Sequence, residues 1–249
     1  MSSRRRIAAA VPATVAALAL ALSACGGEGG LSSAGPTPTA IGPVELWPDL
    51  PAISSPPLGL DASSRERVPG VEVAPGRIGT LDPVAVVRAE TAASPEDASG
   101  IDGLPRQTAA RLASCDGTPV GPAGPTGPTV PAAPSDCPVL RAYHHDLTGD
   151  GRDELIVAVR LPYQRLAVRC YTAEKGGLTR IMSTSDRVIG AELAGRGLIL
   201  RVASAGIPGY EYRTTWSWDR RRGTMVPTRG EIAPDTTRTP WPAPTGLLP

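Results

Sequence analysis

The segment 146–154 carries oxygen-bearing side chains at alternate positions. They belong to Asp146, Thr148, Asp150 and Glu154. Ca²⁺ is a hard cation that takes about six to eight oxygen ligands at roughly 2.3–2.6 Å. The spacing brings these oxygens and the Arg152 carbonyl toward one centre, and Gly151 permits the sharp turn between them. The four side chains are therefore predicted to form a calcium site.

This segment resembles the Asp-rich calcium loop of FG-GAP repeats and, more loosely, an EF-hand loop. The resemblance implies Ca²⁺ as the cofactor, but two features depart from those families. Thr148 offers a neutral hydroxyl where Asp or Asn is usual, and the motif occurs once, whereas FG-GAP blades repeat it. The alternative is an Asp-Gly β-turn that joins two strands, with Asp146 accepting hydrogen bonds from backbone N–H groups. Both interpretations remain open.

The two histidines do not form a metal site with each other. His144 and His145 are adjacent in a predicted strand, so their side chains point to opposite faces. His144 and Asp146 share a face but lack a third Zn²⁺ ligand nearby. The sequence contains no nucleophile elbow, P-loop or HExxH motif, and a non-enzymatic protein with no catalytic residue is predicted. A cell-wall hydrolase that uses Asp146, Asp150 or Glu154 as acid and base is the remote alternative.

The amino terminus has the three parts of an export signal. Arg4, Arg5 and Arg6 precede sixteen uncharged, mostly apolar residues, 7–22. As a helix these would span about 24 Å, which is less than the roughly 30 Å of a bilayer core. A cleaved export signal is therefore favoured over a permanent membrane span.

The next residues, Leu22-Ser23-Ala24-Cys25, resemble the lipobox of bacterial lipoprotein precursors. That resemblance implies a signal peptide at 1–24, cleavage before Cys25, and a lipid on the Cys25 thiol with fatty acids such as palmitate. The protein would be anchored to the outer face of the cell membrane, because multiple acyl chains anchor stably. An ordinary secretory signal that contains Cys is the alternative. Residues 3–7 also partly resemble a twin-arginine signal, so the export route stays open.

Composition limits the partners and the extent of the folded part. The net charge is +1, which excludes nucleic-acid binding by bulk charge. Gly and Pro contribute 28 residues each and gather in 25–79, which is predicted to be a disordered tether. Within it, Val44-Glu45-Leu46-Trp47 would dock on the folded domain or on a partner, but a lone Trp in a linker is more often incidental.

The predicted fold class is α+β, with two short helices followed by an antiparallel β-meander. Asp82-Pro83 begins one helix and residues 105–114 form the other. The domain spans 80–230 and contains a Gly/Pro-rich loop at 118–135, and a loose C-terminal tail occupies 231–249. A period of two predicts strands at 139–145, 154–160, 165–172, 178–183, 188–193, 198–204, 210–218 and 224–228.

Aromatic side chains alternate along the predicted strand 210–218. Tyr210, Tyr212, Trp216 and Trp218 share one face. They are predicted to belong to the core, because the chain has no Phe. A sugar-stacking platform is the alternative.

Three cysteines remain for the folded domain. In an oxidising compartment we favour a Cys115–Cys137 disulfide, which would close the Gly/Pro-rich loop and stabilise the fold by about 3 kcal/mol. Cys115–Cys170 is the alternative. Cys170 shares a strand face with Leu166 and Val168, which is typical of a buried small hydrophobe.

The layout as a whole looks like that of accessory lipoproteins of actinomycetes, including the type that acts in envelope-stress regulation. That likeness implies a non-enzymatic binding or regulatory protein that contacts an envelope protein or a cell-wall component. A calcium-binding adhesion or wall-binding module is the alternative. A solute-binding transporter subunit is disfavoured, because the ordered part is too short for two lobes and shows no βαβ alternation.

Overall fold

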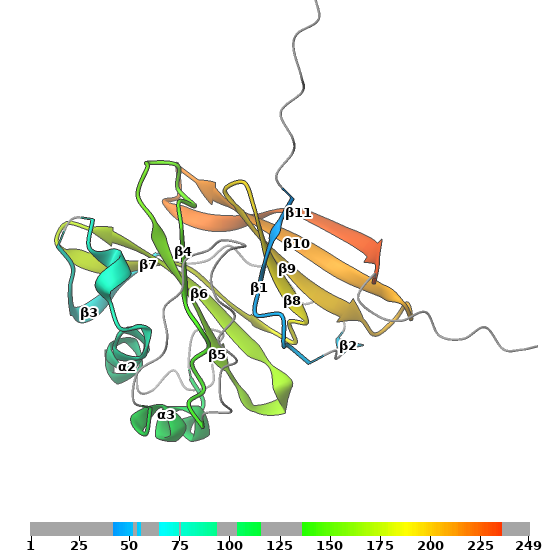
Figure 1. Cartoon of the computed structure of the whole chain (residues 1–249), viewed down its shortest axis with the longest axis horizontal. Coiled ribbons are helices and arrows are strands. Elements are labelled where there is room, and N and C mark those ends of the chain that lie inside the picture. The colour runs from blue at the N-terminus through cyan, green and yellow to red at the C-terminus, as the bar shows by residue number, and fades with distance from the viewer. Residues whose placement is uncertain are drawn as a thin grey trace, which may run out of the picture. The chain divides into compact units, whose positions relative to one another are not determined.

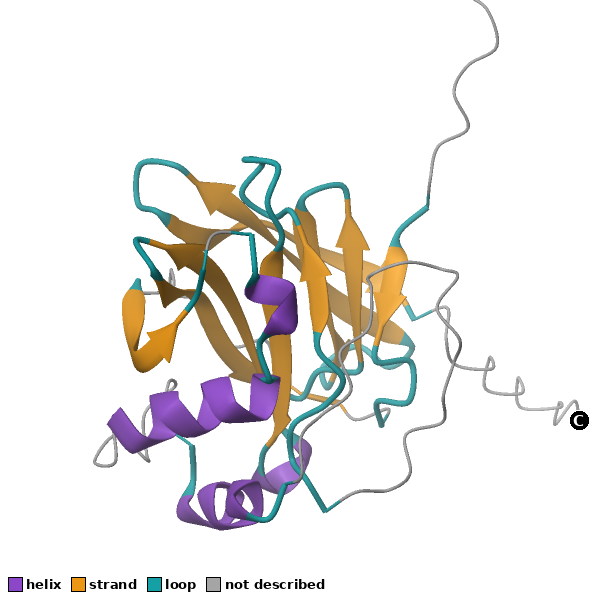
Figure 2. Ribbon diagram, turned by 60° about the vertical axis from the view of Figure 1, so that its left-hand side comes forward, coloured by secondary structure: helices purple, strands orange, loops and turns teal. Residues whose placement is uncertain are grey.

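The computed structural model describes residues 42–51, 54–55, 65–74, 76–93, 104–115 and 136–235. Within them two α-helices, a five-stranded sheet and a six-stranded sheet lie in three layers (Figures 1 and 2). The elements are β1 (Val44–Leu46), β2 (Ser54–Ser55), β3 (Glu66–Glu72), the 3-10 helix η2 (Ile78–Thr80), α2 (Pro83–Ala93), α3 (Arg106–Ala113), β4 (Tyr143–His145), β5 (Glu154–Arg160), η3 (Pro162–Gln164), β6 (Leu166–Glu174), β7 (Gly177–Asp186), β8 (Gly190–Ala194), β9 (Gly197–Ser204), β10 (Tyr210–Asp219) and β11 (Thr224–Pro234).

The predicted α+β class is confirmed, and the strands divide between two sheets. One sheet has the order β3-β7-β6-β5-β4, and the other has the order β1-β8-β9-β10-β11 with the short β2 parallel to β9. Strands β4–β7 and β8–β11 are therefore two consecutive meanders rather than one. The chain passes from the first sheet to the second between Asp186 and Gly190. Strand β5 matches its predicted bounds, and β6–β11 lie within a few residues of theirs, except that β11 continues to Pro234.

Two apolar cores lie on opposite faces of the five-stranded sheet. The core between the sheets includes Ile156, Val168, Met182, Leu198, Trp216 and Met225. The core under the helices includes Val84, Val87, Leu112, Leu155, Val157 and Tyr171. Alternate residues of β5 enter different cores, which explains why this strand is apolar along nearly its whole length.

The helices are held over the sheet by hydrogen bonds as well as by packing. As predicted, Asp82 caps α2: its Oδ1 accepts a hydrogen bond from the Val84 N–H at 2.9 Å. Arg88 of α2 donates to the carbonyls of Leu112 and Cys115, which lie at the end of α3. The α3 C-terminus is thereby satisfied by a charged side chain from the neighbouring helix.

The extent of the predicted tether needs correction. Strands β1, β2 and β3 all fall inside residues 25–79. Trp47 is buried: its Nε1 donates to the Arg141 carbonyl at 2.7 Å, and its ring meets the Tyr143 ring edge-on at 5.6 Å. The Trp47 segment thus docks on the domain, because a short strand can satisfy its backbone on a sheet edge despite flanking Pro and Gly. Residues 25–41 and 118–135 lie outside the described residues.

The C-terminal boundary also moves. The tail was predicted to start at 231, but β11 continues to Pro234, and the Asp235 N–H donates to the Gly209 carbonyl at 2.8 Å. Residues 236–249 lie outside the described residues.

The predicted disulfide is confirmed. Cys115 and Cys137 are bonded, with their Cα atoms 5.0 Å apart. Cys170 is a free thiol with no solvent exposure, and its Sγ lies 3.6 Å from the Met182 Sδ. Burial raises the pKa of the Cys170 thiol, as does the nearby Glu154 carboxylate, so this sulfur behaves as the buried small hydrophobe that was predicted.

Candidate functional site

The loop between β4 and β5 is built around its own carboxylates. Asp146 accepts hydrogen bonds from Gly149 N–H on Oδ1 at 2.6 Å and from Gly151 N–H on Oδ2 at 3.1 Å. Asp150 Oδ1 accepts from the Arg152 N–H at 2.9 Å. Both glycines have positive φ, which a residue with a Cβ adopts only with strain.

Glu154 organises the base of the same loop. Its Oε2 accepts hydrogen bonds from the N–H groups of Leu147 and Thr148 at 2.8 and 3.0 Å, and its Oε1 accepts from the Thr172 hydroxyl at 3.0 Å. The side chain is fully buried. Burial raises its pKa to about 7, although the Thr148, Thr172 and Leu147 hydrogen bonds oppose the rise.

The hydrogen bonds of the loop match the β-turn alternative. Both oxygens of Asp146 and of Glu154 accept from loop or neighbouring donors, and Thr148 donates its hydroxyl weakly to Glu154 at 3.5 Å. In the part of the chain that the structure describes, no group of three or more His, Cys, Asp or Glu side chains is placed to hold a metal ion. Calcium binding by Asp146, Thr148, Asp150 and Glu154 stays a prediction, and the ion would compete with these donors.

Replacing Glu154 with glutamine should change the pH dependence of stability. The folded-state pKa of about 7 lies above the ordinary value of 4.5. The native carboxyl therefore stabilises the fold most below pH 4.5, and this contribution is lost as the pH rises through 7. Glu154→Gln keeps an acceptor for both N–H groups and never ionises. We expect it to match the native chain at pH 4.5 and to exceed its unfolding free energy by about 1–2 kcal/mol at pH 8.

Urea unfolding at both pH values measures this difference. Asp150→Asn, which changes an exposed carboxylate on the same loop, is the matched control. The Asp150 charge is the smallest of the causes that shift the Glu154 pKa, so its pH-dependent gain should be much smaller than that of Glu154→Gln. If the unfolding free energies of Glu154→Gln and the native chain differ by the same amount at pH 4.5 and at pH 8, ionisation of Glu154 is not the cause.

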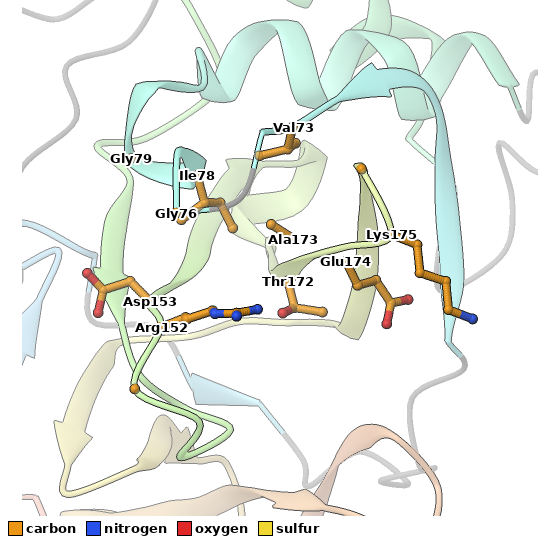
Figure 3. Close-up of a pocket in the computed structure, with 12 residues that line it drawn as sticks. Val73, Gly76, Ile78, Gly79, Arg152, Asp153, Thr172, Ala173, Glu174 and Lys175 are labelled. Atoms are coloured by element: carbon orange, nitrogen blue, oxygen red, sulfur yellow. The ribbon is translucent and has the colours of Figure 1, made fainter.

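Two adjoining hollows open beside this loop, and they share Arg152, Thr172, Ala173, Glu174 and Lys175 as a common wall. The first, of about 390 Å³, also has Val73, Ile78 and Asp153 in its lining. Figure 3 shows Arg152 extending along it toward Thr172, with Asp153 pointing the other way.

The second hollow, of about 440 Å³, is called the cationic hollow below. Its charged lining residues are Arg65, Asp150, Arg152, Glu174, Lys175 and Arg220. They come from the residue before β3, the β4–β5 loop, the β6–β7 hairpin and the turn after β10. Partial burial would raise the pKa of Glu174, but hydrogen bonds from Thr179 and Arg65 outweigh it and hold the pKa below its ordinary value.

No local motif in the sequence indicates the cationic hollow. The predicted strands 165–172, 178–183, 210–218 and 224–228 flank two of its turns, but those turns carry no local motif, and only the folded sheets bring them together. Trp218 lines the hollow and packs partly on the core between the sheets.

The two histidines face opposite ways, as predicted. His144 is half-buried toward η2, and burial lowers its pKa against the opposing effects of Asp153 and of a hydrogen bond with the Ile78 backbone. His145 Nε2 lies 2.5 Å from the Gly195 carbonyl, in the turn between β8 and β9. The two rings therefore serve different layers of the fold.

The aromatic row of β10 divides along its length. Trp216 is buried in the core between the sheets, as predicted, and Trp218 packs against that core. Tyr210, near the start of the strand, is 42% exposed. The core prediction is therefore confirmed for Trp216.

No protein-family model, curated protein or solved structure matches the chain. Among the described residues, none of the helices is long and apolar enough to cross a membrane.

Proposed function

We propose that the chain is the precursor of a lipid-anchored bacterial lipoprotein whose folded domain lies outside the cytoplasm. The observation that carries this proposal is Leu22-Ser23-Ala24-Cys25, placed directly after an uncharged apolar segment and a basic amino terminus. The Cys115–Cys137 disulfide supports it, because disulfides persist in oxidising compartments and are rare in the cytosol.

Within this proposal the domain is a binding or regulatory module rather than an enzyme. Two side chains with strongly raised pKa values, Cys170 and Glu154, lie inside the fold. The Cys170 thiol packs between the sheets, and the Glu154 carboxyl accepts hydrogen bonds from backbone N–H groups. The cationic hollow, by contrast, opens at the surface and gathers charged side chains from several turns. This arrangement suits recognition of an envelope component, in keeping with the layout that resembles envelope-stress accessory lipoproteins.

Metabolic labelling tests the anchor. Cells that express the full chain are grown with a radioactive fatty acid, and the protein is captured and separated by electrophoresis. We expect label on the native chain and none on Cys25→Ala, because Cys25 is the proposed thioether site. Cys170→Ala is the matched control and should keep the label, since the Cys170 thiol is buried. Equal labelling of the native chain and Cys25→Ala, or label on neither, would contradict the proposal.

A further inference from the structure

The cationic hollow holds more positive charge than its own acids neutralise. Arg65 forms an ion pair with Glu174 and also donates a hydrogen bond to the Gly223 carbonyl at 2.8 Å. None of the ion pairs found among the described residues uses Arg152, Lys175 or Arg220. Glu174 is paired with Arg65 and also feels the charge of Lys175. Asp150 is the one other carboxylate of the lining beside these three cations.

Several other donors beside the hollow already have partners. The N–H groups of Gly149 and Gly151 donate to Asp146, so the loop backbone does not offer them to a ligand. The Thr172 hydroxyl donates to Glu154. A ligand that enters the hollow therefore meets cationic side chains as its main donors, and Trp218 supplies an apolar surface beside them.

We propose that the cationic hollow binds a phosphoryl group, whose oxygens accept hydrogen bonds from Arg152, Lys175 and Arg220. A guanidinium presents paired N–H donors that match two oxygens of a phosphate, and a lysine ammonium adds a point charge. The three side chains come from three separate turns, so they can surround an anion rather than line up along one edge. The inference rests on the proposed binding function but not on the lipid anchor.

Isothermal titration of the purified full chain in a non-ionic detergent tests the site. Inorganic pyrophosphate is one probe, and mixed micelles that contain phosphatidylglycerol, compared with phosphatidylcholine micelles, are the other. We expect saturable binding, weakened about 10-fold in each of Arg152→Gln, Lys175→Gln and Arg220→Gln, because each removes one charge-assisted contact. Asp150→Asn should tighten binding, because it removes the facing carboxylate while keeping the acceptor for the Arg152 N–H.

Arg221→Gln is the matched control. It removes the same charge from the neighbouring exposed residue, which does not line the hollow, and should change binding less than 2-fold because it makes no direct contact with an anion bound there. Melting temperatures check that each variant folds.

Pyrophosphate binding with this variant pattern supports a site for free phosphoryl groups. Binding to phosphatidylglycerol micelles alone, with the same pattern, supports a lipid headgroup as the source. No binding to either probe, or equal weakening by Arg220→Gln and Arg221→Gln, overturns the proposal. Such a failure would leave the labelling of Cys25 unaffected, so the anchor and the phosphoryl site are tested separately.

Discussion

Replacing Glu90 with alanine is expected to lower the unfolding free energy by about 3–5 kcal/mol. Glu90 projects from α2 onto the five-stranded sheet, where its Oε2 lies 2.5 Å from Arg169 Nη1 and its Oε1 lies 2.5 Å from Arg180 Nη1. The Tyr171 hydroxyl donates to the same carboxylate at 2.7 Å. Both guanidinium groups are almost wholly buried, with side-chain exposures of 1% and 2%.

The expected loss is large because alanine removes the carboxylate that faces two buried cations. Their desolvation cost stays in the folded state, while the attraction of the Glu90 carboxylate, which offsets much of it, is gone. Glu66→Ala is the matched control, since Glu66 also pairs with Arg180 but its side chain is 48% exposed. The Glu66–Arg180 pair should contribute about 1 kcal/mol or less to the unfolding free energy. Urea unfolding of both variants measures the contrast, and a loss at Glu90 no greater than that at Glu66 would contradict the account.

Trp47→Ala is expected to lower the unfolding free energy by about 3–5 kcal/mol, as is usual when a buried large aromatic residue is truncated. The indole packs against Tyr143, and its Nε1 hydrogen bond to Arg141 is lost with it. Trp47→Phe keeps an aromatic ring but not the indole N–H donor, and it should lower the unfolding free energy by about 1–2 kcal/mol.

Chemical denaturation measures the change in unfolding free energy. Hydrogen exchange at Leu46 and Ala191, which pair between β1 and β8, shows whether β1 detaches. Tyr163→Ala removes a ring that is 85% exposed and should change stability by less than about 0.5 kcal/mol. If Trp47→Ala behaves like Tyr163→Ala, the segment around Trp47 does not stabilise the domain.

The periodic parts of the sequence predicted the fold best. Alternation of apolar and polar residues predicted strands such as β10, and Asp82-Pro83 marked the start of α2, because both signals are local. Strands β1 and β3 were missed because their neighbours are rich in Pro and Gly, and β3 itself contains Pro69 and Gly70. Those strands are stabilised by pairing with β8 and β7, far along the chain.

The division of the strands between two sheets could not be predicted from alternation. Alternation identifies the strands, but no residue between Asp186 and Gly190 indicates that the next strand begins a second sheet. The continuous apolar run of β5 was the available hint, since a strand buried on both faces needs a layer on each side.

The candidate site was predicted in part. The segment 146–154 was identified as chemically distinctive, and its Asp-Gly turn was one of two interpretations. The cations of the hollow were missed because Arg152, Lys175 and Arg220 are ordinary turn residues in the sequence. Their proximity depends on how the two sheets align, which no local pattern encodes.

If this chain becomes a lipid-anchored lipoprotein, the intact mass of the protein purified from the membrane fraction of its cells will show it. We expect a chain that begins at Cys25 and carries the added mass of a diacylglyceryl group, with or without a further acyl chain. A mass equal to the unmodified chain starting at Met1, recovered from the soluble fraction, would contradict the account.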